Sequence, residues 1–324
     1  MESVPAGAAG GRRLWRLATA CAAIRGNLVP TKPQNTALGQ SARRPDCCDT
    51  AVDMLAQDKA HRFAKQNEGA LQASATAGWA AKGALYVTLG VLAVMAAVGS
   101  GGKVSGGKGI LDWVADQPFG QVLLVLAGAG FAGYALWRLA MAALDPEYHG
   151  STKKMVIKRI GWAASGAAHL SLAVAAFQLL DGGSGGASQR RMWLDDALRE
   201  SWGPWLIGGI GLFIVGVGLY QFKKALELGF MDDVQTHEMS SAERSVLKKV
   251  GRIGLAARGI VFPIIGGFVV KAAVEADPSE AKGVGGALGA LAQAGSSWLA
   301  IVAFGLAAYG VLNLFFAKYR TVDI

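Results

Sequence analysis

Charged side chains are scarce in this sequence, and long stretches contain almost none. Asp, Glu, Lys and Arg make up 17% of the residues, below the roughly 25% usual for soluble domains. Hydrophobic residues reach 52% and gather in windows of about 20, the length at which a helix crosses a hydrocarbon core. The windows show almost no polar face at a helical period, which argues against a soluble helical bundle. They cover residues 77–98, 119–143, 160–180, 205–222, 253–274 and 298–317.

The residue sets that mark common enzymes are also missing. The sequence contains no Ser/His/Asp set, carboxylate pair, P-loop or HExxH motif. Residues 128–133 match the dinucleotide fingerprint GxGxxG, but they lie mid-window, where no preceding strand is expected. A haem with two histidine ligands would need a second histidine in the windows, and only His169 lies in one. We therefore expect a protein that is not an enzyme and that has no cofactor and no metal.

Cysteine is confined to the first 50 residues, at Cys21, Cys47 and Cys48. No second CxxC pair or histidine cluster accompanies them, so neither a disulfide nor a zinc site is expected. Residues 1–70 have no periodic pattern and are predicted to be a disordered tail. An Arg-rich run at 12–17 imitates a transit peptide weakly, and Cys21 imitates a lipoprotein site weakly. An alternative is that translation starts downstream, for example at Met54, and that the tail is an over-extended gene start.

The net charge of +9 suggests an orientation in the membrane rather than a nucleic-acid partner. Of the 32 basic residues, 18 lie in the segments on the side of the N-terminus, 7 lie on the opposite side, and 7 lie in the first 50 positions. Basic residues accumulate on the cytoplasmic side of membrane proteins. We therefore expect both termini in the cytoplasm and the lipid bilayer as the principal partner.

The windows form three tandem copies of one two-helix unit, predicted at residues 74–146, 155–228 and 241–320. The first helix of each copy opens with a Gly-rich signature: GWAAKG at 78–83, GWAASG at 161–166 and GLAARG at 254–259. The second helix carries Gly-x-x-x-Tyr, ending at Tyr134, Tyr220 and Tyr309. Between them, the first two copies share Leu-Asp, at 111–112 and 194–195, whereas the third keeps only Leu288 in a Gly/Ala-rich stretch.

These signatures resemble those of a bacterial membrane protein family catalogued as domain of unknown function 1206, over about residues 74–320. The resemblance rests on the GWAAxG openings, the Leu-Asp-Trp stretch at 111–113 and the Gly-x-x-x-Tyr helices. It implies three two-helix repeats and a bacterial plasma membrane location, but no activity. The third copy departs from the pattern, with Leu255 in place of Trp.

The predicted fold class is therefore all-α, a polytopic membrane protein with six transmembrane helices. Each repeat has an even number of spans, so all three share one orientation, which permits a pseudo-threefold bundle. Mitochondrial carriers also contain three hairpins, but their proline and charge motif is absent, because Pro263 is the only proline inside an odd-numbered helix. We reject that kinship.

A few polar residues within the windows are candidates for an axial site or cavity. His169 is the sharpest, because an ionisable ring inside a span often faces the bundle interior. It occupies the repeat position of Tyr86 and Phe262, so a packing role for any planar ring is the favoured explanation. The other polar residues of the windows have two interpretations. Those on the second helices form a polar ring around the axis, or they are aromatic residues and cations at the membrane interface, whose polar ends extend to the surface. That set contains Tyr134, Tyr220, Tyr309, Arg138, Lys224 and Asn313, and Gln178 in the third window is a further candidate for the axis. Lys82 and Arg258 share one repeat position near the cytoplasmic entry of their windows, and we interpret them as cations that extend to the membrane surface.

Basic residues before the third and fifth windows are predicted to contact anionic lipid headgroups. Ser240 to Glu243 has the pattern of a capping box, so that helix should begin outside the membrane. The basic positions recur every fourth residue, on one helical face. They are Lys154, Lys158, Arg244, Lys248 and Arg252.

Two functions fit these patterns. A non-enzymatic membrane scaffold or envelope-maintenance protein is favoured by the packing-rich helices, with membrane-protein partners or a homo-oligomer left open. A channel or transporter for ions or small solutes along the repeat axis is the alternative. Tight packing at the axis would favour the first, and a polar cavity would favour the second.

Overall fold

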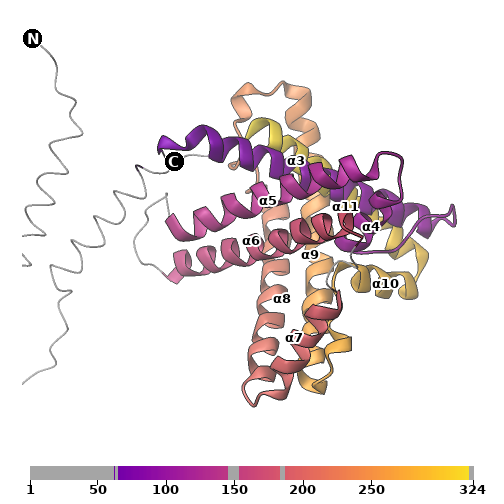
Figure 1. The fold of residues 1–324 in the computed structure, drawn as a ribbon. Coiled ribbons are helices and arrows are strands. Elements are labelled where there is room, and N and C mark those ends of the chain that lie inside the picture. The colour runs from indigo at the N-terminus through magenta and orange to yellow at the C-terminus, as the bar shows by residue number, and fades with distance from the viewer. Residues whose placement is uncertain (1–61, 63–64, 145–152, 183–186, 321–324) are drawn as a thin grey trace, which may run out of the picture. The chain divides into compact units, whose positions relative to one another are not determined.

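The computed structural model describes residues 62, 65–144, 153–182 and 187–320, and all its regular elements there are helices. The cysteines, Met54 and most of the predicted tail lie outside the described residues. The described residues from 69 to 320 belong to one compact unit, to which the account below refers. Six helices are long and apolar enough to cross a membrane (Figure 1). They are α3 (Glu68–Ala97), α5 (Gly120–Leu144), α6 (Lys153–Leu180), α8 (Gly203–Glu227), α9 (Ser241–Glu275) and α11 (Ser296–Tyr319).

A short helix separates the two long helices of every repeat, giving a long–short–long unit three times. These connecting helices are α4 (Gly107–Ala115), α7 (Ala187–Arg199) and α10 (Val284–Ala294). The Gly/Ala-rich sequence of α10 has no distinct period and does not itself indicate a helix. Leu288 of α10 and Leu111 of α4 are nevertheless both fully buried in one apolar core. The third repeat therefore keeps the architecture that its sequence has partly lost.

The helix α3 begins nine residues before the predicted window. Its first turns contain polar side chains, and Gln72 donates a hydrogen bond to the carbonyl oxygen of Arg320 at 2.9 Å. This bond joins the start of α3 to the end of α11. Apolar windows detect the part of a helix that suits lipid, so they miss such polar extensions.

The helix α9 is 35 residues long, or about 52 Å at 1.5 Å per residue, and exceeds a hydrocarbon core of about 30 Å. The predicted capping box at its start is confirmed: the Ser240 side chain accepts from the Glu243 backbone N–H, and the Glu243 carboxylate accepts from the Ser240 N–H. The Glu243 carboxylate also accepts from the Tyr319 hydroxyl at 2.5 Å. The first turns of α9 are thereby fixed to the end of α11.

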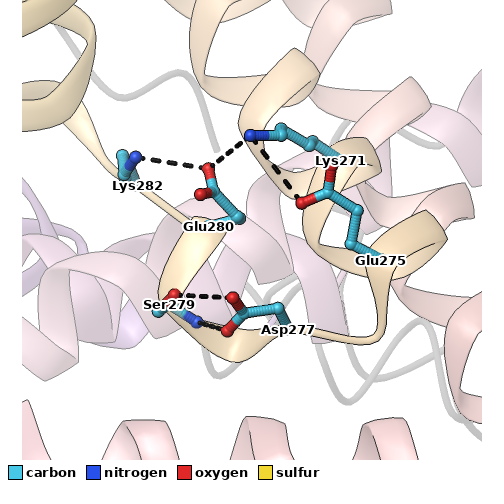
Figure 2. A network of polar contacts seen from close by, with 6 residues as sticks. All are labelled: Lys271, Glu275, Asp277, Ser279, Glu280 and Lys282. Atoms are coloured by element: carbon cyan, nitrogen blue, oxygen red, sulfur yellow. Dashed lines mark hydrogen bonds and ion pairs between the residues drawn. The ribbon is translucent and has the colours of Figure 1, made fainter.

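The turn that joins α9 to α10 is held by a polar network (Figure 2). Lys271 lies 3.1 Å from the Glu280 carboxylate, which Lys282 approaches at 3.2 Å from the other side. Asp277 accepts from both the backbone N–H and the hydroxyl of Ser279, at 2.8 and 2.9 Å. These bonds hold the turn that follows α9, whose C-cap residue Ala276 has the left-handed conformation and donates its N–H to the Ala272 carbonyl oxygen.

Long helices of successive repeats pack side by side. In Figure 1, α5 runs beside α6 and α8 beside α9, so each second helix lies against the first helix of the next repeat. The contact is close because small residues line it. A Cβ atom added at Gly211 would lie 2.9 Å from the Gly266 carbonyl oxygen, and one added at Gly166 would lie 3.3 Å from that of Ala135.

Candidate functional site

In the first repeat, the Gly-rich signature of α3 contacts the Gly-x-x-x-Tyr signature of α5. A Cβ added at Gly78, the first signature glycine, would lie 2.7 Å from the Tyr134 Cα, and one added at Gly130 would lie 2.6 Å from the Ala81 Cβ. Ordinary carbon contacts are 3.5–4.0 Å. The two motifs are therefore the two halves of one helix contact between α3 and α5.

The third repeat makes the same contact between α9 and α11. A Cβ at Gly254 would lie 2.5 Å from the Tyr309 Cα, and one at Gly305 would lie 2.4 Å from the Ala257 Cβ. Each of these residues has the same repeat position as its counterpart in the first repeat. The signature is thus a packing device that brings a tyrosine against the first helix.

The second repeat does not use its signature in this way. Among the described residues, a Cβ added at Gly161 or at Gly216 would meet nothing within 4 Å. Tyr220 is 63% exposed, whereas Tyr134 and Tyr309 are 0% and 3% exposed. The corresponding faces of α6 and α8 therefore have no partner within the described part of the chain.

Aromatic rings connect neighbouring repeats at the position that His169 shares with Tyr86. The His169 ring lies 4.4 Å from the Tyr134 ring of the preceding repeat. The Tyr86 ring lies 4.9 Å from the Tyr309 ring, edge to face. His169 also contacts its own helix, since its Nδ1 lies 2.7 Å from the Ser165 carbonyl oxygen. This geometry favours the packing interpretation of His169.

A row of alternating cations and phenols lies where the first and third repeats meet, and we call it the cation–tyrosine row. Arg138 Nε donates to the Tyr134 hydroxyl at 2.9 Å, and Lys82 Nζ lies 3.4 Å from the same oxygen. Lys82 Nζ is also 5.4 Å from the Tyr309 ring centre, and Arg258 Nη1 donates to the Tyr309 hydroxyl at 2.5 Å. The order is Arg138, Tyr134, Lys82, Tyr309, Arg258.

The middle of the row, formed by Tyr134, Lys82 and Tyr309, is buried, and no member of the row is acidic. Lys82 is 4% exposed and Arg138 and Arg258 are half-buried. None of the ion pairs in the described part of the chain involves these three cations. Buried hydrogen-bond donors beside them also have no acceptor: Arg258 Nε, Trp79 Nε1 and Trp137 Nε1. The arrangement is chemically suited to an anion.

The other predicted axial residues are dispersed. Lys224 forms an ion pair with Asp233 in the linker after α8, and Gln178 is half-buried on α6. Asn313 is fully buried beside Tyr309 and donates to the Tyr309 carbonyl oxygen, which leaves its Oδ1 without a donor. The structure brings together Tyr134, Tyr309, Arg138, Asn313 and His169, but places Tyr220 and Lys224 elsewhere.

Lys82 and Arg258 were interpreted from the sequence as cations that extend to the membrane surface, and for Lys82 the burial contradicts this. The signal that identifies them is their shared repeat position, GWAAKG and GLAARG, where the second repeat has Ser165. That position places each cation one turn after the signature glycine that packs on the tyrosine. The sequence did not reveal this relation because it requires knowing which helices touch.

The predicted headgroup residues lie mostly on the exposed first turns of α9. Arg244 and Lys248 line an open hollow of about 430 Å³, together with Met239, Ser241 and Ser245. Arg252 Nη2 lies 3.4 Å from the Leu226 carbonyl oxygen. Lys158 is exposed on α6, and the side chain of Lys154 lies outside the described residues. No cluster of three or more His, Cys, Asp or Glu residues that would hold a metal occurs where the chain is described.

Comparison with known proteins gives one family and one curated relative. The family profile "Domain of Unknown Function (DUF1206)" matches residues 77–145, 160–227 and 253–320. The chain is 34% identical over 245 residues to an "Uncharacterized protein YxxB" of Bacillus subtilis (strain 168), covering 75% of this chain and 89% of the relative. No solved structure matches. The three matched segments coincide with the three long–short–long units.

Proposed function

Because the chain belongs to the DUF1206 family of three-repeat proteins and is a multi-pass membrane protein, we propose that it is a non-enzymatic scaffold of the bacterial plasma membrane. Both termini lie in the cytoplasm in this proposal. The excess of basic residues on that side supports the orientation. A C-terminal fusion to green fluorescent protein should fluoresce, and a fusion to alkaline phosphatase should be inactive; the reverse pattern would overturn the orientation.

Tight packing between the first and third repeats is the observation that carries the scaffold proposal. Leu89, Ala93, Val302, Ala303 and Leu306 are at most 2% exposed, within one apolar core. Glycines let the helix backbones touch on both sides of this core. Such packing resists the rearrangement that alternating access requires, and it favours a static role.

The second repeat is the proposed docking face, and its occupant is a second copy of the chain. Gly161 on α6 and Gly216 on α8 each carry one half of the contact that the other two repeats complete internally. The α6 face of one copy therefore complements the α8 face of another. An isologous pair of such contacts closes a twofold dimer.

Cysteine cross-linking tests this dimer directly. Ala164 and Gly216 correspond to Ala81 and Gly130, whose added Cβ contact is 2.6 Å in the first repeat. With the native cysteines replaced by serine, co-expressed Ala164→Cys and Gly216→Cys chains should form a disulfide-linked dimer. The matched pair Ala81→Cys and Gly130→Cys should cross-link only within a doubly substituted chain. A disulfide within one Ala164→Cys/Gly216→Cys chain, and none between chains, would overturn the docking proposal.

A channel or transporter along the repeat axis is the second candidate, and the buried cations of the cation–tyrosine row favour it. Conduction also needs a polar, hydrated path between the repeats. The packed core described above supports the scaffold instead. Anion and cation flux into vesicles that contain the purified protein is the deciding measurement: rates equal to those of protein-free vesicles support the scaffold, and saturable flux overturns it.

A further inference from the structure

The cation–tyrosine row brings three positive charges together without a counter-charge, and this carries an inference beyond the scaffold. In spans, ionisable residues normally pair with one another or with backbone carbonyls. Lys82, Arg138 and Arg258 instead share the hydroxyl groups of two tyrosines. Leaving buried charge uncompensated is strongly unfavourable. The row therefore requires a negative group that the described side chains do not supply.

The hydrogen-bond inventory points to the same missing group. Each tyrosine oxygen accepts from a cation, so its own proton needs a further acceptor. Arg258 Nε and the indole N–H groups of Trp79 and Trp137 have no acceptor either. Among the buried side-chain atoms of the described residues near the row, Asn313 Oδ1 is an acceptor without a donor. A donor-rich site of this kind binds an oxyanion with several acceptor oxygens.

The depth of the row indicates where the oxyanion would come from. Lys82 follows the start of its apolar window at Ala77 by five residues, and Arg258 follows the start at Ile253 by five. At 1.5 Å per residue both lie about 8 Å inside the membrane boundary. That level is just below the lipid headgroups on the side expected to be cytoplasmic. Basic pockets between transmembrane helices on this side bind acidic lipid headgroups.

We propose that the cation–tyrosine row binds one phosphate group between the first and third repeats, through Lys82, Arg138 and Arg258 with donation from the two tyrosine hydroxyls. Guanidinium groups match phosphate in geometry and bind it with charge-assisted hydrogen bonds. The ligand offsets part of the positive charge of the row and joins α3, α5, α9 and α11. Its source is either the phosphodiester of an anionic lipid or free inorganic phosphate.

The first measurement uses the wild-type protein in detergent. Phosphorus analysis and native mass spectrometry after extensive delipidation should show about one tightly held phosphate-containing molecule per chain. Stripped protein should then be stabilised against heat by phosphatidylglycerol or by inorganic phosphate, and not by phosphatidylcholine or chloride. Stabilisation by phosphatidylglycerol alone identifies a lipid ligand, whereas stabilisation by inorganic phosphate as well identifies the free ion as sufficient.

Substitutions then locate the site. Lys82→Gln and Arg258→Gln should each weaken binding roughly tenfold to a hundredfold, as expected for a lost charge-assisted hydrogen bond. Lys82→Arg should retain binding, because the same repeat position has arginine in the third repeat. Lys249→Gln removes an exposed charge from α9 and should leave binding unchanged. Equal loss in Lys249→Gln would show nonspecific charge attraction and overturn the proposal.

Two results on the wild-type protein alone would also overturn it, so the test survives variants that fail to fold. One is stripped protein that retains no phosphorus and is stabilised by neither probe. The other is a tyrosinate absorption band near neutral pH, which would show that an ionised phenol is the counter-charge. Neither result bears on the scaffold proposal, which depends on cross-linking and flux.

Discussion

Replacing Gly254 with alanine adds one methyl group at the contact between α9 and α11. The new Cβ would lie 2.5 Å from the Tyr309 Cα and 2.6 Å from its backbone nitrogen, about 1 Å closer than carbon contacts allow. The atoms in the way belong to the backbone, so no side-chain rotation relieves the overlap and the helices must separate. Overpacking of this kind costs about 1–3 kcal/mol.

The second repeat supplies a matched control at the same signature position. Within a single chain, a methyl group at Gly161 meets no atom within 4 Å among the described residues, so Gly161→Ala should show only the higher helix propensity of alanine in monomeric protein. That gain is about 1 kcal/mol in a helix interior. The same gain partly offsets the overlap at Gly254, which leaves a net loss of about 0–2 kcal/mol. The two variants should therefore differ by about 1–3 kcal/mol.

Thermal or denaturant unfolding in detergent measures this difference, with tryptophan fluorescence as the probe. Gly254→Ala should melt below the wild type, and Gly161→Ala should melt at or above it. The pair Gly305→Ala and Gly216→Ala repeats the comparison on the second helices. Equal destabilisation by both members of a pair in monomeric protein would refute the argument, because it would mean that the second repeat also closes on its signature within one chain.

Three further outcomes are expected. His169→Phe should change the melting temperature little, since a planar ring still packs on Tyr134, whereas His169→Ala should lower it clearly in the same assay. Hydrogen bonds from Lys271 and, next, from Lys282 hold the pKa of the Glu280 carboxyl below its usual value. The ionised carboxylate therefore stabilises the folded protein at pH values above the usual carboxyl pKa, and this stabilisation is lost as the pH falls through the lowered pKa. Melting curves of Glu280→Gln and wild type should therefore differ at neutral pH and converge in acid. Substituting Gln for Arg244 and Lys248 together should reduce co-purified phosphatidylglycerol in lipid mass spectra without changing the melting temperature of stripped protein; unchanged lipid would contradict the headgroup contact.

The membrane architecture was predictable because each of its signals is local. Apolar length located the six long helices, and the Ser240–Glu243 pattern predicted the start of α9 correctly. The helix α10 was missed because glycine and alanine carry little periodic signal, although Leu288 marks its buried side. Local patterns depend on neighbours in sequence, so they fail where burial by a distant helix decides the structure.

The candidate site was predicted only in part because it joins residues of different repeats. Tyr134, Tyr309, Arg138 and Asn313 were selected from their repeat positions. Lys82 was assigned to the membrane surface because the sequence does not show that α11 packs against α3 and helps to bury this side chain. The repeat also suggested three equivalent tyrosines, whereas the structure uses two and exposes Tyr220.

The contact between the first and last long helices has a consequence for biosynthesis. The α3 glycines Gly83 and Gly90 pack against Leu314 and Ala307 of α11, which begins about 200 residues after α3 ends. At 5–20 residues per second, α3 enters the membrane roughly 10–40 s before its partner is made. During that interval the small-residue face of α3 that α11 later covers lies exposed to lipid. Insertion machinery or a membrane chaperone that shields this face would then set the yield of the assembled protein.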